Sequence, residues 1–308
     1  MDMTSPPPLP TGRQAYPILL RRRDGCGVKI YIAFVLVKVK NKMSRQMKSR
    51  FMPSLLIGVL LLSACSTSKF CRHEFIERLP LANSRQVLVV ITDSWDSTRG
   101  EAQRFEREKL GDPWTPAGEK AIVNVGRDGL GWGAGLHGFS RKSRPVKKEG
   151  DGKAPAGVFK IATVFGYAAA DSVPFLKFPY LPIDDSTECI DDIKSEYYNL
   201  ILNRRVVSKV DWNSSEQMLR PDDLYKWGAI VEHNPIPRLS KGGSCIFLHI
   251  QAGPSSPTSG CTTFEENDLS RIIQWLRHDA HPVLVQLPRQ EYLRLRAAWQ
   301  LPSFSTHR

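Results

Sequence analysis

A histidine and a cysteine lie twelve positions apart in the stretch FLHIQAGPSSPTSGCTTF, residues 247–264. His249 stands near the end of an apolar run, and Cys261 follows a loop of small residues and prolines. A thiol must become a thiolate to attack a carbonyl carbon, and an imidazole is a suitable base for that step. A nearby imidazolium is also expected to lower the pKa of the thiol. The pair predicts nucleophilic acyl chemistry if the fold brings the two side chains together.

The same two residues also have interpretations without chemistry. A buried cysteine usually packs as a small hydrophobic residue, and a histidine near a strand end is often only hydrogen-bonded. A zinc site is disfavoured because neither a CxxC nor an HExxH motif accompanies the pair. We therefore expect no metal and no other cofactor.

The elements around the pair are expected to be mostly strands, because many short apolar runs are separated by glycine, proline and aspartate turns. This pattern favours a β-rich α+β fold, resembling a mixed sandwich or barrel with a few peripheral helices, over alternating βαβ units. Strands are predicted at 86–92, 120–126, 157–166, 197–207, 227–234, 244–250 and 282–288, and helices at 98–111, 267–278 and 289–299.

The strand at 244–250 is expected to turn Cys245, Phe247 and His249 to one face. The helix at 267–278 is expected to bury one apolar face and to begin at a capping Asn267 or Asp268.

Two glycine-rich segments resemble phosphate-binding loops without the context that such loops need. Residues 133–138 match GxGxxG, but no helix pattern follows to offer amides to a pyrophosphate. The segment at 147–161, KKEGDGKAPAGVFKI, lacks the ligands of an EF-hand and the lysine of a P-loop. Tight turns and close backbone approaches are the simpler explanation of these glycines.

The N-terminal part resembles an export signal. Residues 47–64 combine a basic start with an apolar run too short for a stable spanning helix. The run ends in Leu62-Ser63-Ala64-Cys65, which resembles the cleavage box of bacterial lipoproteins and makes Cys65 the expected lipidation site. Residues 1–46 are then expected to be a gene-model extension, and residues 65–84 are expected to form a tether. A secretory peptide cut after small residues is the alternative.

Processing would change the charge argument. The whole chain has a formal net charge of +12, but residues 1–64 contain 11 basic and only 2 acidic residues. The remainder has a net charge of +3, so nucleic-acid binding loses its main support.

Export would also place the remaining cysteines in an oxidising compartment. These are Cys71, Cys189, Cys245 and Cys261. A bridge between Cys189 and Cys245 is one possibility, which the sequence leaves open.

Several of these motifs, in this order, resemble the L,D-transpeptidase catalytic domain (the YkuD-like, ErfK-type family). The resemblance runs from about Gln86 to Pro288 and includes GLGWGAGL, KKEGDGKAPAGVFKI, DIKSEYYN, GGSCIFLHI and TSGC. It implies a catalytic domain over residues 85–290, followed by a C-terminal helix and tail over 291–308.

The resemblance also implies roles for single residues. Cys261 would be the nucleophile and His249 the general base, with Ser259, Gly260 and the Cys261 amide forming the loop of the oxyanion hole. Thr258 matches the family's Ser/Thr, whereas Ser259 stands where the family usually has histidine. Thr263 stands where many members have Arg or Asn.

Four residues are expected to contact substrate: His233, Asn234, Thr258 and Thr263. Trp132 and Tyr167, with His233, are expected to line a groove for the acceptor.

The family's reaction joins peptidoglycan stem peptides by 3→3 crosslinks through a thioester. A hydrolase on the same scaffold, cleaving crosslinks or lipoprotein–peptidoglycan bonds, is the alternative, and a wall-binding module without catalysis is a third. The expected location is the periplasm, anchored by lipid, on the inner face of the outer membrane. The oligomeric state is not predicted.

Overall fold

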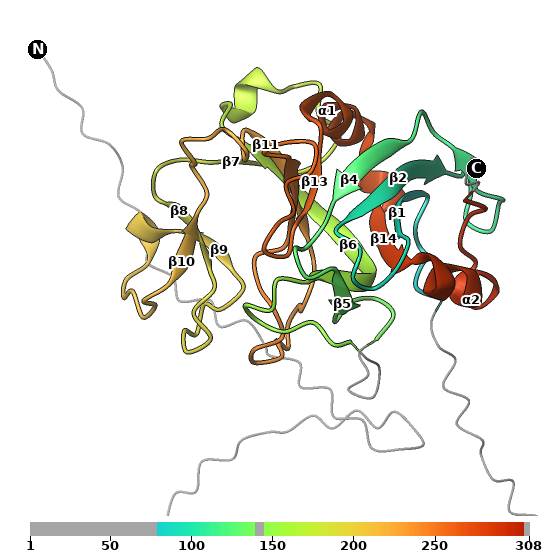
Figure 1. Cartoon of the computed structure of the whole chain (residues 1–308). Coiled ribbons are helices and arrows are strands. Elements are labelled where there is room, and N and C mark those ends of the chain that lie inside the picture. The colour runs from blue at the N-terminus through green and yellow to red at the C-terminus, as the bar shows by residue number, and fades with distance from the viewer. Residues whose placement is uncertain (1–78, 139–144, 305–308) are drawn as a thin grey trace, which may run out of the picture. The chain divides into compact units, whose positions relative to one another are not determined.

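The computed structural model describes residues 79–138 and 145–304 (Figure 1). The expected signal, the tether up to residue 78 and Cys26, Cys65 and Cys71 lie outside the described residues. Neither described helix is long and apolar enough to cross a membrane.

The described elements follow one another in this order. The strands are β1 (Gln86–Thr92), β2 (Arg99–Glu106), β3 (Thr115–Pro116), β4 (Ala121–Asn124), β5 (Leu130–Trp132), β6 (Ala154–Gly166), β7 (Tyr180–Pro182), β8 (Thr187–Ile190), β9 (Ile201–Asn203), β10 (Ser215–Gln217), β11 (Trp227–Val231), β12 (Phe247–Ile250), β13 (Thr262–Phe264) and β14 (Val283–Pro288). The helices are α1 (Glu266–Trp275) and α2 (Arg289–Trp299), with short 3₁₀ turns at Ala170–Ser172, Arg204–Val206 and His278–Ala280.

Eight of these strands form a closed barrel. The order is β1-β14-β6-β11-β12-β13-β4-β2, and the antiparallel pairing of β2 with β1 closes the ring. The pairs β1–β14 and β12–β13 are parallel, and the other pairs in the ring are antiparallel. The expectation of a β-rich fold is therefore confirmed, and the architecture is a barrel.

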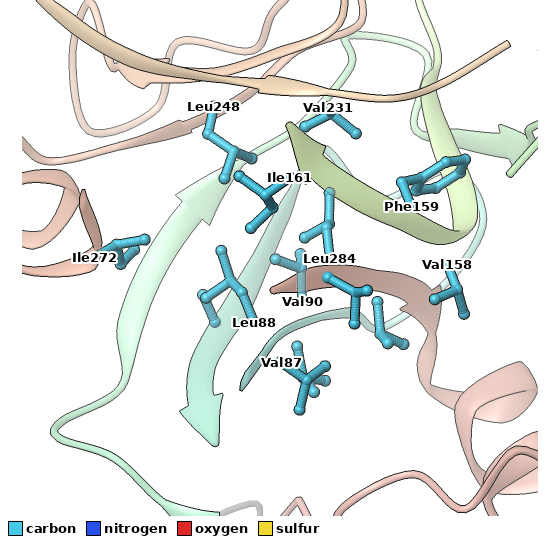
Figure 2. Close-up of a cluster of buried hydrophobic side chains, with 14 of the residues drawn as sticks. Val87, Leu88, Val90, Val158, Phe159, Ile161, Val231, Leu248, Ile272 and Leu284 are labelled. Carbon is cyan, nitrogen blue, oxygen red and sulfur yellow. The ribbon is translucent and has the colours of Figure 1, made fainter. Parts of the chain in front are cut away.

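The inside of the barrel is filled with aliphatic and aromatic side chains from most of its strands (Figure 2). β1 reads QVLVVIT and is buried at every position, which explains its continuous apolar run. Leu88 of β1 lies opposite Leu284 of β14, and Ile161 of β6 lies near Leu248 of β12. Packing of this kind holds β12, which carries His249, against the rest of the barrel.

The two helices cover the barrel from outside. α1 packs against β11 and β12, and buries Leu269, Ile272 and Ile273 as its periodicity predicts. Its N-cap is Glu265, so the prediction that Asn267 or Asp268 caps it is wrong; Asp268 lies in the first turn.

α2 packs against β1 and β14, and its buried residues belong to the barrel core. The boundary expected at residue 290 therefore falls inside α2.

A second, three-stranded sheet of order β10-β8-β9 lies beside the barrel, at the left of Figure 1. We call it the side sheet. Its centre is the buried Glu188, which accepts hydrogen bonds from Arg204, Trp212 and Ser215. Burial alone would raise the pKa of Glu188, but these bonds lower it to about 2.

Two predicted elements are wrong or too long. The segment 98–111, predicted as a helix, forms β2, because its pairing with both β1 and β4 outweighs the local preference of its charged residues for a helix. The predicted strand 197–207 is reduced to β9, because Asn199 has a φ of 60° that interrupts an extended chain.

Leu248 tests how much the core contributes. Leu248→Ala removes a fully buried side chain, and we expect it to lower the free energy of unfolding by about 2–5 kcal/mol. The matched control is Leu293→Ala on the exposed face of α2, expected to stay within about 0.5 kcal/mol of wild type. Urea denaturation measures both, and equal effects would contradict the assignment of Leu248 to the core.

Candidate active site

The structure brings Cys261 and His249 to one pocket of about 440 Å³. β12 and β13 are parallel neighbours, with His249 opposite Thr263, so the cysteine just before β13 lies beside the histidine strand. The 250–261 loop is the crossover between these two strands. The other wall of the pocket comes from the side sheet and from the chain that returns from it to β11.

Cys261 is held by backbone groups on the strand next to it. Its Sγ accepts a hydrogen bond from the Phe247 N–H at 3.3 Å and lies 3.5 Å from the Cys245 carbonyl oxygen. The side chain is buried, with the residue 8% exposed. An N–H directed at sulfur stabilises a thiolate, so β12 supplies one group that favours the nucleophilic form.

The turn before Cys261 is fixed by Thr258. Its Oγ1 donates to the Cys261 carbonyl at 2.6 Å and accepts from the Gly260 N–H at 3.0 Å. The Gly260 amide is thus already used inside the turn, contrary to its expected role as an oxyanion donor. The Cys261 amide makes no hydrogen bond to any other described residue and is the donor that remains.

His249 has one of its two ring nitrogens occupied. Its Nδ1 lies 2.8 Å from the Ile250 carbonyl oxygen, an arrangement in which Nδ1 carries the proton and donates it. Nε2 is then the proton acceptor, as a general base requires. The Tyr225 ring packs edge-on against the imidazole, with centroids 4.9 Å apart.

The two groups rest in their neutral forms. Burial, aided by the negative charge of Glu216, raises the pKa of Cys261 to about 12. Burial also lowers the pKa of His249 to about 4. Burial thus disfavours both charged forms and shifts the thiol pKa in the direction opposite to that expected beside an imidazolium. The arrangement fits a base that takes the thiol proton as the sulfur attacks.

Of the other predicted site residues, Thr258, Ser259, Gly260 and Thr263 all line the pocket. Ser259 is at the surface, where its Oγ accepts a hydrogen bond from Arg127 at 3.1 Å. Thr263 is buried on β13 opposite Asn124. Position 259 thus carries a surface hydroxyl held by an arginine.

His233 and Asn234 do not line this pocket. His233 is 3% exposed, its Nε2 lies 2.9 Å from the Gly242 carbonyl oxygen, and burial lowers its pKa to about 3. The Asn234 side chain bonds Leu239 and Gly243 and shapes the loop before Cys245. Their expected contact with substrate stays a prediction, which their place outside this pocket does not support.

The residues expected to form the acceptor groove also lie outside this pocket. Trp132 packs against Trp95 and Trp299, and the Tyr167 hydroxyl bonds the Arg220 backbone; neither lines the pocket.

The glycines of the GxGxxG segment are required because neighbouring atoms approach their backbone closely. A Cβ at Gly133 would lie 2.7 Å from the His233 Nδ1, and a Cβ at Gly135 would lie 2.3 Å from the Val158 carbonyl oxygen. These glycines let β5 and the following loop lie against β6. The sequence predicts such a close approach because no helix pattern follows the motif.

A disulfide joins the side sheet to the site. Cys189 of β8 is bonded to Cys245, with Cα atoms 5.9 Å apart, so the bridge that the sequence left open is present. Cys245 has a φ of 54°, which makes β12 begin only at Phe247. Phe247 and Cys245 pack with Cys261, while Ile246, Leu248 and Ile250 enter the barrel core, as the predicted alternation requires.

The segment DIKSEYYN holds the chain just before β12 by hydrogen bonds. The Asn199 side chain accepts from the Cys245 N–H and donates to the His233 and Asn234 carbonyls. The Tyr198 hydroxyl accepts from the Gly243 N–H and donates to Glu149. The motif therefore positions the strand that carries His249.

Sequence reasoning missed several charged groups of the pocket. Lys147 is buried and bonds Asp151 at 2.6 Å, while Glu149 accepts hydrogen bonds from Tyr198 and Ser244. These residues belong to KKEGDG, a motif noted only for its glycines. Glu216 was missed altogether, because it lies in a segment without a regular pattern.

Within the described residues, no group of three or more histidine, cysteine and acidic side chains is arranged to hold a metal ion. In comparisons with known proteins, no family model, no curated protein and no solved structure matches this chain.

The pH dependence of Cys261 alkylation tests the neutral resting state. Because the thiolate is the reactive form and burial raises the thiol pKa to about 12, we expect the rate with iodoacetamide to keep rising from about pH 8 to pH 11. In urea the same thiol should show a midpoint near the ordinary value of about 8.5. Mass spectrometry of the Cys261 peptide isolates this residue from other cysteines. A native rate that levels off below pH 8 would show a thiolate–imidazolium pair.

Proposed function

We propose that this protein is a cysteine-dependent L,D-transpeptidase that acts on peptidoglycan stem peptides and forms 3→3 crosslinks. The observation that carries the proposal is the pairing of Cys261 with His249 in one pocket, with the imidazole oriented by the Ile250 carbonyl. The sequence resemblance supplies the substrate class. The periplasmic location and a lipid on Cys65 belong to the same proposal.

The first half-reaction forms a thioester. The Cys261 sulfur attacks the carbonyl of the third stem residue while His249 Nε2 takes the thiol proton. The Cys261 amide donates to the oxyanion that develops. The intermediate collapses, the C–N bond to the terminal D-alanine breaks, and the imidazolium protonates the leaving amine.

The second half-reaction frees the enzyme. The side-chain amine of a diamino acid in a neighbouring stem attacks the thioester, the C–S bond breaks, and the sulfur regains its proton through His249. A pocket of about 440 Å³ is large enough to hold part of a peptide. Hydrolysis of the same thioester by water is the second candidate function.

Single substitutions at the pair test the proposal. We expect Cys261→Ala to form no covalent adduct with a carbapenem or a tetrapeptide stem, as seen by intact-protein mass. His249→Gln should slow adduct formation by on the order of 100-fold, the usual size of a general-base effect.

The reaction products separate the two candidates. Wild type incubated with tetrapeptide-bearing muropeptides should release D-alanine and give 3→3 dimers; tripeptide alone would favour the hydrolase. Adduct on Cys261→Ala would overturn the choice of nucleophile.

A further inference from the structure

Glu216 lies in the pocket of Cys261 and has no part in the first half-reaction. It is the middle residue of β10, and its backbone pairs with Cys189 of β8. Because Cys189 is bonded to Cys245, this carboxylate is fixed to the strand that leads into His249.

The carboxylate has one oxygen engaged and one available. Oε1 accepts a hydrogen bond from the Tyr225 hydroxyl and lies 3.9 Å from the Arg220 guanidinium. That guanidinium donates hydrogen bonds from two of its nitrogens to the carboxylate of Asp222. Oε2 makes no hydrogen bond within the described residues, and the side chain is 29% exposed. An acceptor therefore remains on the pocket wall.

Tyr225 connects this carboxylate to the reacting groups. Its ring contacts the imidazole of His249 and packs 5.6 Å from the ring of Phe247, whose N–H holds the sulfur. The charge of Glu216 is close enough to raise the pKa of Cys261.

A carboxylate in this place opposes formation of the thiolate, so it does not help the first half-reaction. The second half-reaction has the opposite need. An acceptor amine reaches the site mainly as an ammonium ion, which cannot attack a carbonyl until it loses a proton. A partly buried carboxylate attracts that cation more strongly than one in water would.

We infer that Glu216 binds the ammonium group of the acceptor and removes the proton that makes it a nucleophile. This inference rests on the proposed transpeptidase function and names the acceptor as a primary amine that arrives charged. Tyr225 is a positioning residue, which holds the carboxylate through its hydroxyl.

The protons balance in this scheme. The ammonium gives one proton to Glu216, and the free amine attacks the thioester carbon. As the C–S bond breaks, the nitrogen gives a second proton to His249, which passes it to the sulfur. Glu216 releases its proton to water, so the products are an amide, a thiol and one free proton.

The test compares two acceptors on one thioester. Hydroxylamine is uncharged at neutral pH and needs no base to become a nucleophile, whereas the diamino acid of a stem tetrapeptide is charged. We expect Glu216→Gln to form the thioester at least as fast as wild type, because a charge that opposes the thiolate is lost. Its rate of 3→3 dimer formation should fall by on the order of 100-fold, while its reaction with hydroxylamine stays unchanged.

The controls separate this role from a structural one. Glu232→Gln makes the same change on a surface residue paired with Lys160, and should behave as wild type in every assay. Tyr225→Phe keeps the ring beside His249 but removes the donor to Glu216, and should lower dimer formation without affecting hydroxylamine.

Four results would overturn the inference. In Glu216→Gln, equal loss with both acceptors would mean a structural role, and unchanged dimer formation would mean no role in aminolysis. A wild type that forms the thioester but no dimer would remove the acceptor itself. A wild type that forms no thioester would refute the proposed function, and this inference with it.

Discussion

The covalent bond between Cys189 and Cys245 is the constraint on which the site depends. Cys245 stands two residues before β12, and its carbonyl oxygen contacts the Cys261 sulfur. Without the bridge, the side sheet would be attached to the barrel by its two connecting chains and by noncovalent contacts alone. A bond across 56 residues also removes much of the entropy of the unfolded chain, so it stabilises the assembled pocket.

The barrel and the side sheet contribute different groups to the site. The barrel supplies the parts that must not move: the strand of His249, the turn of Cys261 and the N–H of Phe247. The side sheet supplies charge in the form of Glu216. Burial shifts the pKa values of the thiol and the imidazole in the directions that favour their neutral forms.

Hydrophobic runs and the alternation of side chains predict the buried strands and which face each side chain takes. The run 86–92 is recognisable as a buried strand because residues 87–91 form an unbroken apolar run. The alternation of Cys245, Phe247 and His249 against Ile246, Leu248 and Ile250 was recognisable for the same reason. Segment 98–111 was not, because Arg99–Glu106 is a strand only through its partners on both sides, which are distant in sequence.

The site shows the same division. Cys261 and His249 carry chemistry in their residue types, so sequence alone marked them. His233 was expected to contact substrate. Its burial, in contact with Phe159 of β6, could be known only from the fold. Glu216 carries an ordinary side chain, and only its tie to Cys189 and its contact with Tyr225 give it significance.

The parallel pairing of β1 with β14 has a consequence for the order in which the chain folds. Val87 lies opposite Val283, so the first barrel strand needs a partner almost two hundred residues later. The ring cannot close until nearly the whole described chain is present, and closing so long a loop is slow. The ring therefore closes only after most of the described chain has been synthesised.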